Sequence, residues 1–146
     1  MTKNTIFIIC SGKGRDCLSS VFLSSYDLPE NIINFDDFDS LRDFLFKHEA
    51  GLLFRVNTPY ILFVDSGLGR DDCLSLLSDI KDDSRLKRMP VVVFGNCDEG
   101  GFVKSCYSCG GSVYIEKPSD EKGLVEVVRK LKDFLESTNI PVMSLR

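Results

Sequence analysis

Three short runs of the sequence are almost entirely apolar and rich in β-branched and aromatic residues. They are TIFIIC at 5–10, YILFV at 60–64 and VVVF at 91–94. A strand that faces water on one side alternates apolar and polar residues, whereas a strand covered on both faces is continuously apolar. The runs therefore predict a parallel sheet with helices on both of its faces.

Stretches with helical periodicity separate these runs and two weaker strand patterns, at 31–35 and 112–115. The apolar stripes of the expected helices fall at 17–22, 41–45, 74–80, 102–106 and 124–135. Asp39 or Ser40 is available as the cap of the second helix. In the last helix, Leu124, Phe134 and Leu135 belong to the expected apolar face, opposite charged residues. Strand and helix alternate five times, which predicts one doubly wound α/β domain over residues 1–138 and a C-terminal tail over 139–146.

Composition narrows the class of protein. The chain has 146 residues, enough for one domain with a core of its own, and a net charge of −4, which argues against a nucleic-acid surface. No apolar stretch reaches the roughly 20 residues needed to span a bilayer. Six cysteines occur without the pattern of a secretory signal peptide. We therefore expect reduced thiols, a cytoplasmic location and no contact with membranes.

The run YILFV ends on an acid, Asp65, which the glycine-containing sequence SGLG follows. In open parallel sheets, ligands and chemistry gather beyond the carboxyl ends of the strands. Asp65 is expected at that edge of the sheet. The other residues expected there are Ser11, Gly12, Gly95, Asn96 and Lys117.

Two longer stretches resemble the receiver domain of two-component response regulators. PYILFVDSGLGRDDCLSLLSDIKDDSRLKRMPVVVF resembles the family's segment from the phosphoacceptor strand to the fourth strand, and GGSVYIEKPSD resembles its fifth strand with the Lys-Pro pair. The likeness spans residues 5–136. It implies a flavodoxin-like fold with strand order 2-1-3-4-5. It also implies Asp65 as the phosphoacceptor position, Lys117 as the site lysine and Tyr114 as the switch aromatic.

The sequence departs from the family at three points, one of which is Gly69 in place of the proline usual after the acceptor. Receivers carry a pair of acids after the first strand that hold Mg²⁺, and here Cys10 and Ser11 stand in that place. Neither is a good ligand for a hard cation. The hydroxyl residue at the end of the family's fourth strand is replaced by Gly95. No cofactor is expected, and any Mg²⁺ recruited by carbonyls such as that of Gly67 is expected to bind weakly.

The charges that remain favour an ion pair. Asp65 and Lys117 sum to zero, whereas a phosphoryl group would add about two negative charges against one ammonium. We therefore predict a direct Asp65–Lys117 contact, with Gly95 clearing space for the lysine. Phosphorylation at Asp65 is expected to be disfavoured.

These features predict a signal-transduction module, not an enzyme, that acts through protein–protein interaction in or beside a phosphorelay. The partner would be a histidine kinase or a downstream signalling protein. By likeness to receivers, the output face would comprise the helix at 102–106, the strand at 112–115 with Tyr114, and the helix at 124–135. The chain would be a monomer or a weak dimer through that face. Two alternatives stay open: an active phosphoacceptor with unusual Mg²⁺ dependence, and a nucleotide- or flavin-binding domain that uses the loop from Ser11 to Gly14.

Four other motifs are interpreted as structural. CYSC at 106–109 lacks the second pair of ligands that a zinc site needs, so its cysteines are expected to be core or surface thiols. FDDFD at 35–39 is interpreted as helix-start acids, with a displaced metal site as the alternative. DDSRLKR at 82–88 is expected to be a solvated loop. His48, the single histidine, is interpreted as a cation near the end of a helix.

Overall fold

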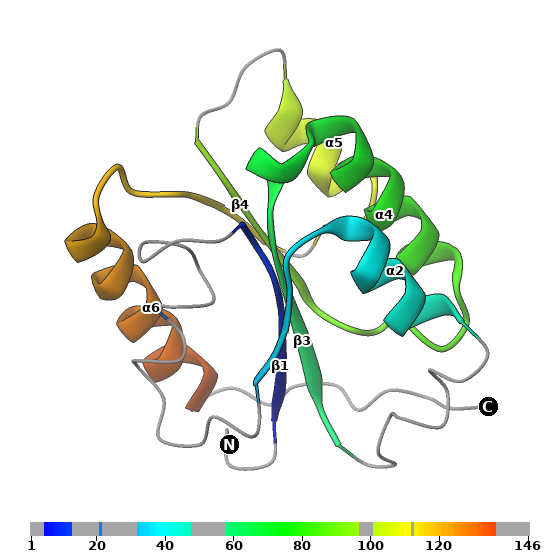
Figure 1. Cartoon of the computed structure of the whole chain (residues 1–146), viewed down its shortest axis with the longest axis horizontal. Helices are drawn as coiled ribbons and strands as arrows, with labels where there is room; N and C mark the ends of the chain where they lie inside the picture. The colour runs from blue at the N-terminus through cyan, green and yellow to red at the C-terminus, as the bar shows by residue number, and fades with distance from the viewer. Residues whose placement is uncertain are drawn as a thin grey trace.

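A five-stranded parallel sheet forms the centre of the molecule, in the order β2-β1-β3-β4-β5 (Figure 1). The computed structural model describes residues 5–12, 21, 32–47, 58–96, 101–111 and 113–136. The strands are β1 (Ile6–Cys10), β2 (Ile32–Phe35), β3 (Tyr60–Asp65), β4 (Val91–Gly95) and β5 (Val113–Glu116). The parallel sheet and the strand order predicted from the sequence are confirmed.

Helices cover both faces of this sheet. On one side lie α2 (Phe38–Phe46), α4 (Arg70–Asp82) and α5 (Phe102–Ser108), and α6 (Glu121–Glu136) lies on the other (Figure 1). A single 3₁₀ turn, η2 (Ser66–Leu68), connects β3 to α4. Val21 is helical, but the rest of the stripe at 17–22, His48 and the predicted tail at 139–146 lie outside the described residues. None of the helices in the described ranges has both the length and the apolar character needed to cross a membrane.

The strands have continuous apolar runs because a hydrophobic core lies on each face of the sheet. Alternate residues of each strand point to opposite faces, and both faces are covered. The core under α2, α4 and α5 includes Ile8, Leu62, Val93, Leu41, Leu76 and Leu77. The core under α6 includes Phe7, Ile9, Phe63, Phe94, Leu124 and Val128. Each central strand therefore has no face left for polar side chains.

The N-terminus of α2 differs from the expectation. The capping residue is Asp37, not Asp39 or Ser40: its carboxylate oxygen Oδ1 accepts the backbone N–H of Ser40 at 2.7 Å. Asp37 has an extended backbone, which lets its side chain reach back to the first turn of the helix. The helix-start role expected for the acids of FDDFD therefore holds for Asp37.

The buried faces of two other helices also differ in part. In α4 the buried residues are Cys73, Leu76, Leu77 and Ile80, while Leu74 is only partly buried. In α6, burial falls toward the C-terminal end, and Phe134 is 60% exposed although its spacing predicted a core position. Periodicity identifies the face of a helix but not how far along the helix its packing partners extend.

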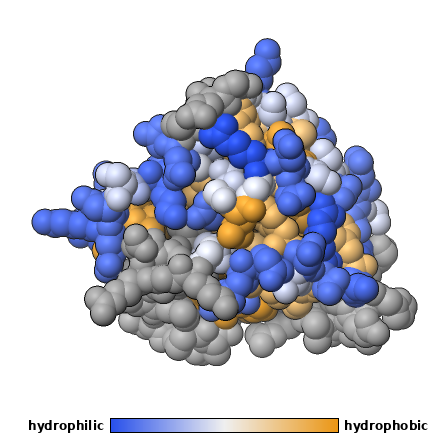
Figure 2. All heavy atoms as spheres, turned by 45° about the horizontal axis from the view of Figure 1, so that its top comes forward, coloured by the Kyte–Doolittle hydropathy of each residue, from blue (hydrophilic) through white to orange (hydrophobic). Residues whose placement is uncertain are grey.

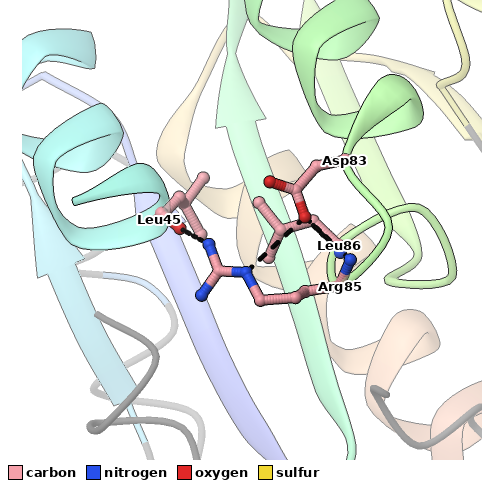
Figure 3. A network of polar contacts seen from close by, with 4 residues as sticks. All are labelled: Leu45, Asp83, Arg85 and Leu86. Atoms are coloured by element: carbon pink, nitrogen blue, oxygen red, sulfur yellow. Dashed lines mark hydrogen bonds and ion pairs between the residues drawn. The ribbon is translucent and has the colours of Figure 1, made fainter. Parts of the chain in front are cut away.

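The charges of the loop that follows α4 predicted a fully solvated segment, but the loop also makes specific contacts with the rest of the protein. Arg85 donates from Nη2 to the backbone carbonyl of Leu45 at 2.8 Å and lies 3.6 Å, from Nε, from the Asp83 carboxylate (Figure 3). The same carboxylate accepts the N–H groups of Arg85 and Leu86, and Leu86 is fully buried. Since Leu45 lies in the last turn of α2, where carbonyls lack partners within the helix, Arg85 ties this loop to the end of α2.

Replacing Arg85 by alanine is expected to lower the free energy of unfolding by about 1–2 kcal/mol, because a charged hydrogen bond to a half-buried carbonyl is lost. Urea denaturation of the variant and the wild type measures the difference. Arg88→Ala, at an exposed position of the same loop, is the control and is expected to change stability by less than about 0.5 kcal/mol. Equal losses in the two variants would contradict this role of Arg85.

Candidate functional site

The five parallel strands all end at one edge of the sheet, at the top of Figure 1. The parallel register brings their last residues side by side, because neighbouring strands run in the same direction. The neighbours at this edge are Cys10 with Val64, Asp65 with Phe94, and Gly95 with Glu116. The polar residues that the sequence placed at the strand ends are therefore close in space.

Asp65 and Lys117 form the ion pair predicted from the sequence. The ammonium Nζ of Lys117 lies 2.8 Å from the carboxylate oxygen Oδ2 of Asp65. The other oxygen, Oδ1, accepts the backbone N–H of Gly67 at 2.8 Å. The Asp65 side chain is 10% exposed and that of Lys117 is 24% exposed. Both carboxylate oxygens therefore have a donor, and the negative charge is compensated within the chain.

This pairing changes what the carboxylate can do. A charge in a partly buried setting interacts with its partner more strongly than it would at an exposed position. For Asp65 to accept a phosphoryl group, the product must hold about two further negative charges beside the Lys117 ammonium. Within the described residues, Lys117 is the ammonium that contacts this carboxylate.

The residues in the place of the family's acid pair do not fit Mg²⁺. Cys10 and Ser11 are fully buried. Burial raises the pKa of the Cys10 thiol to about 12, with further contributions from the negative charges of Asp37, Asp36 and Asp65. The thiol is therefore neutral, whereas Mg²⁺ prefers carboxylate and other oxygen ligands. The described ranges contain no cluster of three or more acidic, histidine or cysteine side chains that could hold a metal ion.

The loop from Ser11 to Gly14 is described only at its first two residues. Ser11 donates its backbone N–H to the carbonyl of Phe35 at 3.1 Å. This N–H extends the β1–β2 pairing and is not directed at a ligand. Lys13 and Gly14 lie outside the described residues.

The space left by Gly95 is filled by two hydroxyl-bearing side chains. A Cβ built on Gly95 would lie 2.1 Å from the hydroxyl oxygen of Tyr114 and 2.9 Å from Oγ of Ser66. The three atoms nearest to that position belong to Tyr114 and Ser66, so the side chain closest to Gly95 is that of Tyr114 and not that of Lys117. The physical reason is that the aromatic ring of Tyr114 reaches across from β5 and takes this volume first.

Ser66 is a residue of the site that sequence reasoning missed. It directly follows Asp65, is 3% exposed and contributes one wall of the space at Gly95. A small polar residue between the acid and the first glycine of SGLG was the available signal. That signal is weak, because serine is common in turns that have no functional role.

Tyr114 contacts two aromatic residues of α5, one through its ring and one through its backbone. Its ring meets that of Phe102, the first residue of α5, edge to face, with centroids 6.1 Å apart and planes at 76°. Its backbone N–H donates to the hydroxyl of Tyr107 at 3.1 Å. In CYSC, Cys106 is buried in the core and Cys109 is half-buried at the end of α5, both as free thiols.

A parallel sheet of order 2-1-3-4-5, with an acid at the end of β3 paired to a lysine just after β5, defines the class of protein. The chain has the fold of response-regulator receiver domains, and its sequence resembles theirs. No family model matches its sequence. The acid pair and the fourth-strand hydroxyl of that class are replaced here by Cys10, Ser11 and Gly95.

The sequence is similar to that of the response regulator Rcp1 of Synechocystis sp., with 28% identity over 104 residues that cover 70% of this chain and 71% of Rcp1. Solved structures share the fold. The receiver domain from Rhodospirillum rubrum aligns with a TM-score of 0.74 at 20% identity, covering 95% of this chain and 99% of that one. The phosphorylated cyanobacterial phytochrome response regulator RcpA gives 0.72 at 21% identity, covering 94% and 99%. The Mn²⁺-bound form of Rcp1 gives 0.72 at 22% identity, covering 93% and 99%.

Asp65→Asn is expected to lower the free energy of unfolding by about 1–3 kcal/mol, because Lys117 is left partly buried without its counter-charge. A double-mutant cycle with Lys117→Met, followed by urea denaturation, measures the coupling of the pair. Asp79→Asn is the matched control: the Asp79 side chain is 51% exposed, so its pair with Arg42 is screened by water and the expected loss is below about 1 kcal/mol. Additive effects of the two site variants would contradict the energetic role of the pair.

Alkaline pH is expected to destabilise the protein through two buried thiols. Burial raises the pKa of Cys73, as of Cys10, from an ordinary 9.0 to about 12. The unfolded chain therefore releases these protons first, so the stabilisation is complete below pH 9 and is lost as the pH rises toward 12. At about pH 10, each thiol costs about 1.4 kcal/mol.

Urea denaturation at about pH 8 and about pH 10 measures this loss. The double variant Cys10→Ala/Cys73→Ala is expected to lose less stability between the two pH values than the wild type, whatever its stability at the lower pH. Cys109→Ala, which changes a half-buried thiol in α5's C-cap position, is the control and is expected to behave as the wild type. An unchanged pH dependence in the double variant would show that other groups cause the alkaline loss.

Proposed function

We propose that this receiver domain is a signalling module that acts through protein–protein interaction in or beside a phosphorelay, with its interaction face held in one state without phosphorylation of Asp65. The observation that carries the proposal is the position of Tyr114, whose hydroxyl occupies the space where a side chain at position 95 would begin. In receivers, the hydroxyl residue at that position couples the phosphoryl group to the aromatic residue. Here Gly95 has no side chain to move, and Tyr114 already fills the space.

The electrostatics of the site support the same proposal. Asp65 is neutralised by Lys117 and bonded to the N–H of Gly67. Cys10 contributes a neutral thiol where a carboxylate would help to hold Mg²⁺. Phosphoryl transfer depends on neutralising the charge of the transferred group, and this site offers one ammonium for about two added charges.

The proposed interaction face comprises α5, β5 and α6. β5 is the edge strand of the sheet; its first residue, Val113, is 42% exposed, and Tyr107 of α5 is 50% exposed. The protein partner would be a histidine kinase or a downstream signalling protein, and a weak dimer through the same face is the alternative to a monomer. Figure 2 brings the edge with the strand ends forward and shows an apolar area bordered by hydrophilic residues at that edge, which is a different view from one onto the proposed face. Free thiols at Cys10, Cys73 and Cys106 support the proposed cytoplasmic location.

An active phosphoacceptor is the second candidate, and one observation favours it. Asp65 and Lys117 keep their contact, and two proteins of the same fold have been solved as a phosphorylated form and as a Mn²⁺-bound form. If this chain works as they do, Asp65 would take up a phosphoryl group despite the loss of the acid pair. A single labelling experiment separates the two candidates.

The experiment treats the protein with acetyl phosphate and Mg²⁺ and follows the phosphoryl adduct by intact-mass measurement. The wild type is expected to label slowly. Ser11→Asp, and Cys10→Asp/Ser11→Asp where it folds, restore carboxylates for the metal and are expected to label at least about tenfold faster, as preorganised charge stabilisation at a reacting centre commonly provides.

Asp65→Asn is the matched control in both backgrounds, because it removes the acceptor and must abolish the adduct. Wild-type protein that labels as fast as Ser11→Asp would overturn the proposal in favour of the active phosphoacceptor. An adduct that persists in Asp65→Asn would show that another residue is modified.

A further inference from the structure

We infer that Arg70 is a positioning residue for Tyr114 and that it acts through the ring of Phe102. The inference rests on the proposed function in one respect, namely that the placement of Tyr114 matters to a partner. The placement itself follows from contacts between three elements: the first turn of α4, the first turn of α5, and β5. None of these contacts involves Lys117 or the carboxylate of Asp65.

The first contact joins α4 to α5. The guanidinium carbon of Arg70 lies 4.9 Å from the centre of the Phe102 ring. A cation over the face of an aromatic ring is attracted by the negative charge density of that face, and the attraction is stronger where water is partly excluded. Phe102 is 5% exposed and Arg70 is half-buried, so this contact lies at the margin of the core.

The second contact joins α5 to β5. Phe102 meets Tyr114 edge to face at 6.1 Å, an arrangement that aromatic quadrupoles favour. Gly101, just before Phe102, has a φ of 75° in the left-handed region, which sets the direction in which the helix and its first side chain start. Phe102 therefore contacts both the guanidinium of Arg70 and the ring of Tyr114.

Both contacts involve the ring of Phe102. Tyr114 can remain at Gly95 only if its ring keeps the position that Phe102 borders, and Phe102 is also in contact with the guanidinium of Arg70. Arg70 begins α4 directly after the turn that follows Asp65. A chain of packed side chains therefore connects the turn after Asp65 to Tyr114. In receivers, the hydroxyl residue at the position of Gly95 provides the corresponding connection.

The test measures the position of Tyr114 in the full chain by ¹⁹F NMR with fluorotyrosine. The sequence has four tyrosines, and Tyr114→Phe assigns the resonance of interest. Gly95→Ala supplies the reference for a displaced ring, because its Cβ would lie 2.1 Å from the hydroxyl oxygen of Tyr114. The wild type supplies the reference for the inserted ring.

Arg70→Ala is expected to move the Tyr114 resonance toward the displaced reference, with an about fivefold rise in the ratio of displaced to inserted rings, the size expected for one lost cation–π contact. Phe102→Leu is expected to move it further, and Arg70→Lys less. Arg42→Ala is the matched control, since Arg42 also lies over a ring, that of Phe46 at 5.9 Å, but on α2. It is expected to leave the Tyr114 resonance at its wild-type position.

A folded Arg70→Ala protein whose Tyr114 resonance stays at the wild-type position would overturn the inference, and so would an equal shift in Arg42→Ala. If Arg70→Ala does not fold, Arg70→Lys and Phe102→Leu decide the question by the same criterion. The measurement uses neither a partner nor a phosphate donor. Its failure therefore leaves the proposed function standing, and rapid phosphorylation of the wild type would leave the positioning role of Arg70 untouched.

Discussion

The hydroxyl of Tyr114 and the backbone of Gly95 approach so closely that no side chain fits between them, and the rest of the site is arranged around this contact. Glycine within a strand is unfavourable, because it loses more conformational freedom than other residues and has no side chain to pack. Here the missing side chain is replaced by the ring of Tyr114 and by Ser66, which line the same space. Because Gly95 in β4 has no side chain, the ring of Tyr114 from β5 can pack against the backbone at that position.

The second constraint on the site is electrostatic. A carboxylate at the end of a buried strand is tolerated only if its charge is paired and its oxygens are hydrogen-bonded. Asp65 meets both conditions within the chain, through Lys117 and the N–H of Gly67. Next to it, Cys10 adds bulk without charge, because burial keeps its thiol protonated. At this edge of the sheet the charge of Asp65 is therefore compensated by Lys117, and the acids whose negative charges also act on Cys10, Asp36 and Asp37, follow β2.

Sequence reasoning predicted features that depend on local pattern and failed for those that depend on packing. Continuous apolar runs identified buried strands, and the acid after YILFV with the Lys-Pro pair identified Asp65 and Lys117. The same reasoning assigned the space at Gly95 to Lys117, because a sequence shows that a side chain is missing but not which neighbour fills the gap. Arg85 was expected in solvent for a related reason: its acceptor, the carbonyl of Leu45, is brought near only by tertiary folding. Roles such as that of Asp65 as phosphoacceptor stay predictions, because geometry alone does not test them.

The two constraints together limit how such a domain can be regulated. A modification shifts a conformational equilibrium only as far as it interacts differently with the two states. A phosphoryl group on Asp65 would find no hydroxyl at position 95, so its direct influence on Tyr114 would be small even if it formed. Groups that do contact the ring, such as Phe102, remain the means by which Tyr114 can be moved. Under the proposed function, a partner that bound against α5 and β5 would act on Tyr114 through the packing of buried Phe102, and the state of the face would be set by that binding and not by chemistry at Asp65.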